Sequence, residues 1–136
     1  MARVTGGRLV VRALKREGVE CIFALSGGHV DPIFQACIDE DLRLIDVRHE
    51  QAAAFMADGW ARVTGRPGVA VVTAGPGVTN AVTGIWNAFE CLSPIVVFGG
   101  KSPMFEFDLG SLQELNSLTL VESVTKKAAR GSSRWR

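Results

Sequence analysis

The stretch that decides the fold reads Val69-Ala70-Val71-Val72-Thr73-Ala74-Gly75-Pro76-Gly77. Its first five residues are apolar or β-branched without alternation, which predicts a short strand buried on both faces of a parallel sheet. The glycines and the proline that follow predict a tight turn, and residues 78–91 have the spacing of a helix. A buried strand that passes through a glycine turn into a helix is the repeating unit of an α/β fold.

The same alternation continues on both sides of this stretch. Helices are predicted over residues 5–17, 30–39 and 50–64, and strands over residues 19–25, 42–47 and 94–98. Short connections between them imply parallel strands joined by right-handed crossovers. The predicted fold class is therefore α/β, a doubly wound parallel sheet flanked by helices in a single domain.

Apolar spacing also predicts which side chains of the helices face the core. In the first helix these are Leu9, Val10, Ala13 and Leu14, in the second Ile33, Phe34 and Cys37, and in the third Ala53, Met56, Trp60 and Val63. Beyond Lys101 the pattern weakens, so residues 102–116 are expected to form a loop and residues 117–124 a short helix. We expect a domain over residues 1–126 and a basic irregular tail over residues 127–136.

Composition narrows the class of protein. A chain of 136 residues with 47% apolar and 21% charged residues suits one globular domain. The last eleven residues hold five basic side chains and no acid, which leaves ten basic and fourteen acidic residues, a net charge of −4, in the body. A nucleic-acid partner is not expected, because a domain that binds nucleic acid usually presents a basic face.

The three cysteines, Cys21, Cys37 and Cys91, are widely spaced and form no CxxC pair. Free thiols in a reducing compartment are expected, and the spacing matches no zinc site. The first residues contain no hydrophobic signal core, and no apolar run approaches the roughly 20 residues that a membrane span requires. The expected location is cytoplasmic, without a membrane partner.

Glu50 stands where a predicted strand ends and an alanine-rich helix begins, in Arg48-His49-Glu50-Gln51-Ala52-Ala53-Ala54. Open α/β sheets bind ligands at the carboxyl ends of their strands. A carboxyl group among apolar neighbours holds its proton more readily, which suits proton exchange with a heterocycle. The alternative is an acidic residue that only interacts favourably with the helix dipole.

Two glycine turns follow other predicted strands, Ser26-Gly27-Gly28-His29 and Gly75-Pro76-Gly77. Bare backbone there can lie flat against a planar or anionic ligand, although each could also be a turn without a ligand. The second turn lacks the third glycine and the later acid of a dinucleotide-binding fingerprint, which disfavours a nucleotide or flavin domain. A hydrolase is disfavoured too, because there is no GxSxG elbow. Three strand ends that bring glycine turns, Glu50 and His29 to one edge favour a binding site.

The chain resembles thiamine-diphosphate-dependent enzymes of the acetolactate synthase and benzaldehyde lyase group. The resemblance rests on motifs in the family's order and spacing across residues 5–126. They are Thr5-Gly6-Gly7, Leu9-Val10-Val11, Gly18-Val19-Glu20, Arg48 to Ala54, Ala57, Gly59, Ala61-Arg62, Gly75-Pro76-Gly77, Thr79-Asn80, Pro94 and Gly110-Ser111-Leu112-Gln113-Glu114. His29, Asp31 and Ile33 to Cys37 make benzaldehyde lyase the nearest match within the group.

The resemblance implies a pyrimidine-binding domain. Its glutamate, matching Glu50, would hydrogen-bond N1′ of the cofactor's aminopyrimidine and promote the imino tautomer, which then removes the C2 proton of the thiazolium. His29 and Gln113 match positions that face the substrate, a small carbonyl compound. Gly27, Gly28, Gly75, Pro76, Gly77 and Asn80 are the remaining residues expected at the cofactor.

The resemblance also implies what lies elsewhere. The family binds the diphosphate and its Mg²⁺ through a separate domain with a GDG…N motif, which these residues do not contain, so no metal ligand is assigned. That domain or a homodimer is the expected partner. Some relatives bind FAD, but with contacts largely outside this segment. Residues after Lys126 depart from the family pattern, which suggests a truncation or an altered reading frame. A non-catalytic interaction or dimerisation module derived from such an enzyme remains the alternative.

Overall fold

The computed structural model describes residues 4–131 of the chain. Four parallel strands form one sheet in the order β2-β1-β3-β4, from β1 (Cys21–Ala24), β2 (Arg43–Asp46), β3 (Gly68–Val72) and β4 (Ile95–Gly99). β1 pairs with β2 on one side and with β3 on the other. The chain therefore changes direction across the sheet between β1 and β3, which confirms the predicted doubly wound α/β fold.

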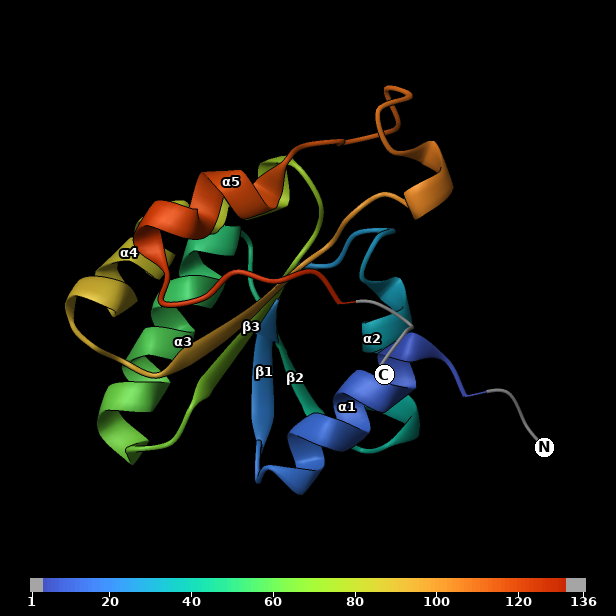
Figure 1. Cartoon of the computed structure of the whole chain (residues 1–136). Coiled ribbons are helices and arrows are strands. Elements are labelled where there is room, and N and C mark those ends of the chain that lie inside the picture. The colour runs from blue at the N-terminus through green and yellow to red at the C-terminus, as the bar shows by residue number, and fades with distance from the viewer. Residues whose placement is uncertain (1–3, 132–136) are drawn as a thin grey trace.

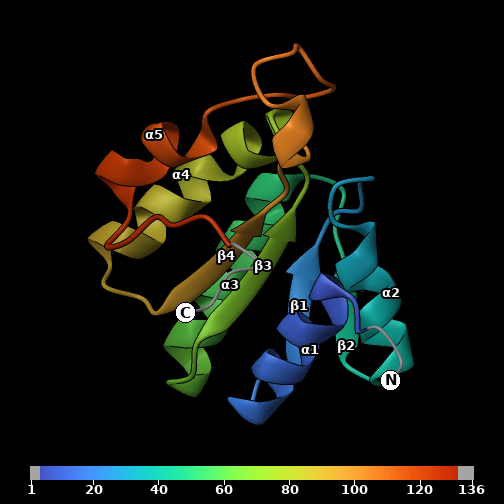
Figure 2. The same ribbon diagram turned by 45° about the vertical axis from the view of Figure 1, so that its right-hand side comes forward.

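Helices cover both faces of the sheet (Figures 1 and 2). α1 (Gly6–Arg16) and α2 (Asp31–Asp39) pack together on one face, and α3 (Glu50–Thr64) and α4 (Pro76–Glu90) on the other. The short α5 (Ser117–Val121) and the 3₁₀ turn η2 (Glu122–Val124) lie against α4, and a second 3₁₀ turn, η1 (Met104–Glu106), interrupts the loop after β4. This arrangement gives the sheet two cores, one for each face.

β3 is the centre of both cores, because all five of its residues are buried. Ala70 and Val72 face α3 and α4, whereas Val69 and Val71 face α1 and α2. The prediction of a strand buried on both faces is confirmed. The helix that follows begins at Pro76, two residues earlier than predicted, because proline suits the first position of a helix, where no backbone N–H is needed.

The predicted inward stripe of α1 is partly wrong. Leu14 is buried as expected and Val10 is half-buried, but Leu9 and Ala13 are exposed and Val11 is fully buried instead. The reason is close packing on α2. A Cβ atom at Gly7 would lie 2.1 Å from the carbonyl oxygen of Pro32, so α1 turns its glycine face toward its neighbour.

The predicted stripe of α3 is also partly wrong. Ala53 is buried and Trp60 is half-buried, with its ring edge-on to Phe23, but Met56 and Val63 are exposed. The buried face is made of small residues, namely Ala53, Ala54, Ala57 and Ala61. Alanine allows a close approach to α4, where a Cβ atom at Gly84 would lie 2.6 Å from that of Ala54.

The end of the chain matches the predicted loop and short helix. Residues 102–116 contain only η1, and residues 117–124 form α5 and η2. Of the predicted tail, residues 127–131 have no helix or strand, and residues 132–136 lie outside the described part. No helix in the described residues is long and apolar enough to cross a membrane.

Candidate active site

The carboxyl ends of β1 and β3 meet at the point where the strand order changes direction, which is where open α/β sheets bind ligands. The turn at residues 25–30 follows β1, and residues 73–75 join β3 to α4. The loop after β4 rises beyond the same edge (Figure 2). These segments carry most of the predicted site residues.

Glu50 is the first residue of α3 and is only 7% exposed. Its Oε2 atom accepts a hydrogen bond of 2.9 Å from the Nδ2 atom of Asn80, on α4. Its Oε1 atom accepts no hydrogen bond from residues 4–131 and lies 3.5 Å from the point where a Cβ atom of Gly77 would stand. The carboxyl group thus has one oxygen held by an amide and one facing bare backbone.

Glycine is required at two positions where the chain enters α4, one in the turn before the helix and one at its second residue. Gly75 has φ +54°, and a Cβ atom there would lie 2.6 Å from the carbonyl oxygen of Gln113. At Gly77 a Cβ atom would lie 2.8 Å from Cγ2 of Thr73. Pro76 is exposed at the first position of α4. Both glycines are therefore required by close packing. Together they leave a stretch of bare backbone, the glycine wall, which at Gly77 lies beside Oε1 of Glu50.

Thr73 brings the two predicted substrate-side residues together. It is buried directly after β3, with its Oγ1 atom 3.4 Å from Nδ1 of His29 and 3.5 Å from Oε1 of Gln113. A Cβ atom at Gly27 would lie 2.5 Å from the same hydroxyl group, so this glycine leaves room for it. Sequence reasoning missed Thr73. A threonine at the end of a buried strand, just before a glycine turn, was the available signal.

Gly28 differs from the other predicted glycines, because it is exposed and a Cβ atom there would meet nothing within 4 Å. The structure thus places Glu50, Asn80 and Gly77 in one group and His29, Gln113, Gly27 and Gly75 around Thr73 in a second. Thr73 joins the groups, because its side chain also contacts the position of a Gly77 Cβ atom.

Within residues 4–131, no three His, Cys, Asp or Glu side chains gather in a way that could hold a metal ion.

A second carboxylate joins α3 to α4 two turns further along. Asp58 is 4% exposed and accepts 2.8 Å hydrogen bonds from Nε and Nη2 of Arg62 and from Nδ2 of Asn87. Burial alone would raise the pKa of Asp58, but the hydrogen bonds from Arg62 and Asn87 and the charge of Arg62 outweigh it and lower the pKa. This cluster fixes α3 against α4 and so sets where Glu50 meets Asn80.

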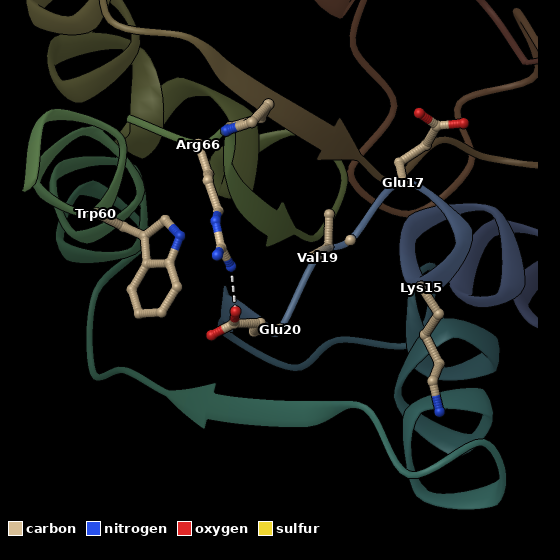
Figure 3. A pocket seen from close by; sticks show the side chains of 8 residues that line it. Lys15, Glu17, Val19, Glu20, Trp60 and Arg66 are labelled. Carbon is tan, nitrogen blue, oxygen red and sulfur yellow. Dashed lines mark hydrogen bonds and ion pairs between the residues drawn. The ribbon is translucent and has the colours of Figure 1, made fainter. Parts of the chain in front are cut away.

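Two of the hollows on the surface of residues 4–131 differ in their position relative to the site. One, of about 300 Å³, is lined by His29, Ile33, Phe98, Lys101 and Leu118 among others, and adjoins the candidate site. The other, of about 640 Å³, lies at the opposite end of the sheet (Figure 3). There the Trp60 indole faces the exposed Arg66–Glu20 ion pair, with Lys15 and Glu17 across the hollow. The larger hollow contains none of the predicted site residues.

Comparison with known proteins gives the family. The family described as "Thiamine pyrophosphate enzyme, N-terminal TPP binding domain" matches residues 4–120. The chain is 48% identical over 127 residues to the acetolactate synthase large subunit IlvG of Mycobacterium tuberculosis, covering 93% of this chain and 23% of that protein. It is 44% identical over 121 residues to 2-hydroxyacyl-CoA lyase 2 of Homo sapiens, covering 89% and 19%.

The chain is also similar to 2-hydroxyacyl-CoA lyase 2 of Xenopus laevis. The two are 45% identical over 125 residues, which cover 92% of this chain and 19% of that protein. The chain spans about a fifth of the length of the curated relatives it matches. The match covers every strand of the sheet and each predicted site residue from Gly27 to Gln113. The chain therefore belongs to the thiamine pyrophosphate enzymes, as their N-terminal cofactor-binding domain.

Proposed function

We propose that this chain supplies the pyrimidine-binding part of an enzyme that makes or breaks carbon–carbon bonds next to carbonyl groups, acting on 2-oxo acids or 2-hydroxy ketones. The observation that carries the proposal is the buried Glu50 carboxyl, with Oε2 held by Asn80 and Oε1 facing Gly77. The names of its relatives, an acetolactate synthase and 2-hydroxyacyl-CoA lyases, describe this kind of chemistry.

The residues present fit an aminopyrimidine ring. Such a ring is planar and carries a ring nitrogen that can exchange a proton with a carboxyl group. Bare backbone at Gly75 and Gly77, the glycine wall, offers such a ring a flat surface without side chains. A buried carboxyl group with one uncommitted oxygen offers the proton partner. When bound, thiamine diphosphate supplies a nucleophilic carbon that attacks carbonyl groups.

Each side chain then has a distinct task. Glu50 exchanges a proton with the ring nitrogen through Oε1, while Asn80 keeps the carboxyl group in one orientation. His29 and Gln113 face the substrate and orient its oxygen atoms. Thr73 stands between these two and fixes their relative position, since a β-branched side chain has few rotamers.

The other half of the site is proposed to come from elsewhere in the protein or from a related chain, or from a second copy in a homodimer. We assign to that half the diphosphate group and its Mg²⁺. The surface proposed to meet it lies on α3 and α4, where Phe55, Met56, Trp86 and Phe89 are exposed. An apolar patch of this kind is typical of an interaction site.

The cytoplasm is the proposed location. Cys21 and Cys37 are buried free thiols, and burial raises the pKa of both, which keeps them protonated and unreactive. Such thiols suit a reducing compartment.

The same apolar surface favours one alternative, a non-catalytic module that binds a full-length relative or a second copy.

Complementation separates the two functions. The chain would be mixed with the M. tuberculosis acetolactate synthase large subunit lacking its matching segment, together with thiamine diphosphate, Mg²⁺ and pyruvate, a simple 2-oxo acid. Each protein alone is the control. The proposal expects turnover only in the mixture. Association of the two proteins without turnover or cofactor binding would favour the module.

A further inference from the structure

Glu114 belongs to neither of the two groups of site residues, around Glu50 and around Thr73. Its carboxylate accepts hydrogen bonds from the backbone of the turn at residues 108–111. Oε1 accepts a 2.5 Å hydrogen bond from the backbone N–H of Asp108, and Oε2 accepts bonds of 3.0 and 3.2 Å from those of Gly110 and Ser111. Its own N–H donates to the carbonyl oxygen of Ser111. One side chain thus satisfies three backbone donors of the turn that precedes Gln113.

The state of Glu114 agrees with this geometry. The hydrogen bond from Asp108 is the largest influence and lowers the pKa of Glu114, opposed by burial and supported by the bonds from Ser111 and Gly110 and by the charge of Lys101. The side chain is therefore a carboxylate at neutral pH, and charge-assisted hydrogen bonds of this kind are stronger than neutral ones.

The backbone of the turn needs such an anchor. Asp108, Gly110 and Gln113 have φ angles of 62°, 71° and 58°, in the left-handed region that non-glycine residues rarely adopt. Apolar burial does not hold the turn in this shape, because Leu109 and Leu112 are both exposed. The three hydrogen bonds to the Glu114 carboxylate stabilise it instead. A 3.5 Å contact from Ser102 to the carbonyl oxygen of Leu112 and backbone hydrogen bonds from Leu109 to Glu106 and from Glu114 to Ser111 add to them.

The turn ends at the candidate site. Gln113 follows it directly, its backbone lies against bare Gly75, and its side-chain oxygen lies 3.5 Å from the Thr73 hydroxyl group. A change in the turn at residues 108–111 would therefore move the amide of Gln113 relative to Thr73 and His29.

We propose that Glu114 is a positioning residue, whose carboxylate fixes the turn at residues 108–111 and so holds the side chain of Gln113 at Thr73. Glu114 itself touches neither cofactor nor substrate. The importance of this positioning for catalysis rests on the proposed function, but the positioning itself can be measured on this chain without any cofactor.

The test is amide hydrogen exchange by NMR in the Glu114→Gln variant, which keeps the size of the side chain but loses its charge and replaces one acceptor with a donor. Glu122→Gln, at an exposed glutamate in η2, is the control. In Glu114→Gln we expect at least tenfold faster exchange at Asp108, Gly110 and Ser111. The side-chain NH₂ resonances of Gln113 should also move to random-coil positions, while Val71 in β3 keeps its protection.

Unchanged exchange in the turn, or an unmoved Gln113 side chain, would overturn the proposal. Glu114→Asp provides a second variant if Val71 also loses protection, because it keeps the charge and only draws the carboxylate back by one methylene. The same local effect with smaller amplitude is expected there. Since no cofactor is present, failure of this test leaves the complementation result untouched, and the reverse also holds.

Discussion

Glu50 and Asp58 stand about two turns apart on α3, and each accepts a hydrogen bond from an asparagine of α4. Asp58 also binds Arg62 through both oxygens, so its carboxylate has three donors. Glu50 has Asn80 as its only donor among residues 4–131, and its second oxygen faces the glycine wall. A carboxylate paired with an asparagine is thus structural in the middle of α3, at Asp58, whereas at the start of the helix Glu50 keeps one oxygen for chemistry.

The difference comes from what surrounds each pair. Arg62 is on the same helix as Asp58, one turn later, and compensates its charge. No cation forms an ion pair with Glu50 in the described residues, and its neighbours at Gly77 and Thr73 are neutral. A buried carboxyl group without a cation is costly to keep as a structural element, so its presence is better explained by function. A variant at Glu50 should therefore lose turnover, whereas a variant at Asp58 should lose stability.

The largest expected effect is on turnover in Glu50→Gln. Glutamine keeps the shape and the bond with Asn80 but cannot exchange a proton, so turnover of the complemented enzyme should fall about 10²–10⁴-fold. Its free energy of unfolding should change little. Turnover with pyruvate and urea unfolding of the chain measure the two. Glu90→Gln, at the exposed end of α4, is the matched control. Wild-type turnover in Glu50→Gln would mean that the role assigned to this residue is wrong.

Asp58→Ala should show the reverse pattern. It leaves Asn87 and Arg62 without their shared partner between α3 and α4, and the free energy of unfolding should fall by about 2–3 kcal/mol. This is less than the roughly 3–5 kcal/mol expected for breaking a fully buried pair, because Arg62 is partly exposed. Urea unfolding provides the measurement. Asp46→Ala is the control, because Asp46 is exposed and its 3.8 Å pair with Arg48 should contribute little. Equal losses in both variants would contradict the assignment.

The contribution of Asp58 should also depend on pH. Its pKa in the folded chain is lowered from the ordinary value of 3.8, so the unfolded state binds a proton at higher pH than the folded state. The stabilisation is present above the unfolded value and is lost as pH falls through the folded one. The difference in unfolding free energy between wild type and Asp58→Ala should therefore shrink below about pH 3.8. A difference that stays constant down to acid unfolding would exclude this account.

Particular residues show which parts of the fold and of the candidate site can be predicted from the sequence alone. The strands and the glycine turns were predictable because buried β-branched runs and Gly-Pro-Gly leave few alternatives. The inward faces of α1 and α3 were not predictable in the same way. Gly7 and the alanines of α3 allow the helix backbones to approach closely, so small residues form the buried faces, whereas hydrophobicity alone points to Met56 and Val63. Thr73 was missed because a β-branched residue after an apolar run is typical of a strand end, and only the fold places its hydroxyl group between His29 and Gln113.

Gly77→Ala tests the open side of Glu50. The new Cβ atom would lie 2.8 Å from Cγ2 of Thr73 and point toward the Glu50 Oε1 atom, so the glycine wall would no longer be flat. Cofactor affinity in the complemented enzyme should fall about tenfold, in the range expected for overpacking. Titration with thiamine diphosphate measures it. Gly59→Ala, on α3, meets nothing within 4 Å and should leave affinity unchanged while slightly stabilising the helix. Unaltered cofactor affinity in Gly77→Ala would mean that the glycine wall is not part of the cofactor-binding site.

The smallest expected effect is at Thr73→Val, which removes the hydroxyl group between the substrate-side residues and keeps the β-branched shape. His29 and Gln113 would lose a shared partner, at a cost of about 1 kcal/mol, or about fivefold in turnover. Because the hydroxyl group forms no hydrogen bond with Glu50, cofactor affinity should stay as in wild type. Steady-state kinetics with pyruvate and titration with thiamine diphosphate separate the two effects. Thr83→Val, on the exposed face of α4, is the control. A loss of cofactor affinity in Thr73→Val would join the two groups of side chains into one binding site for the cofactor and contradict the division of tasks between Glu50 and His29.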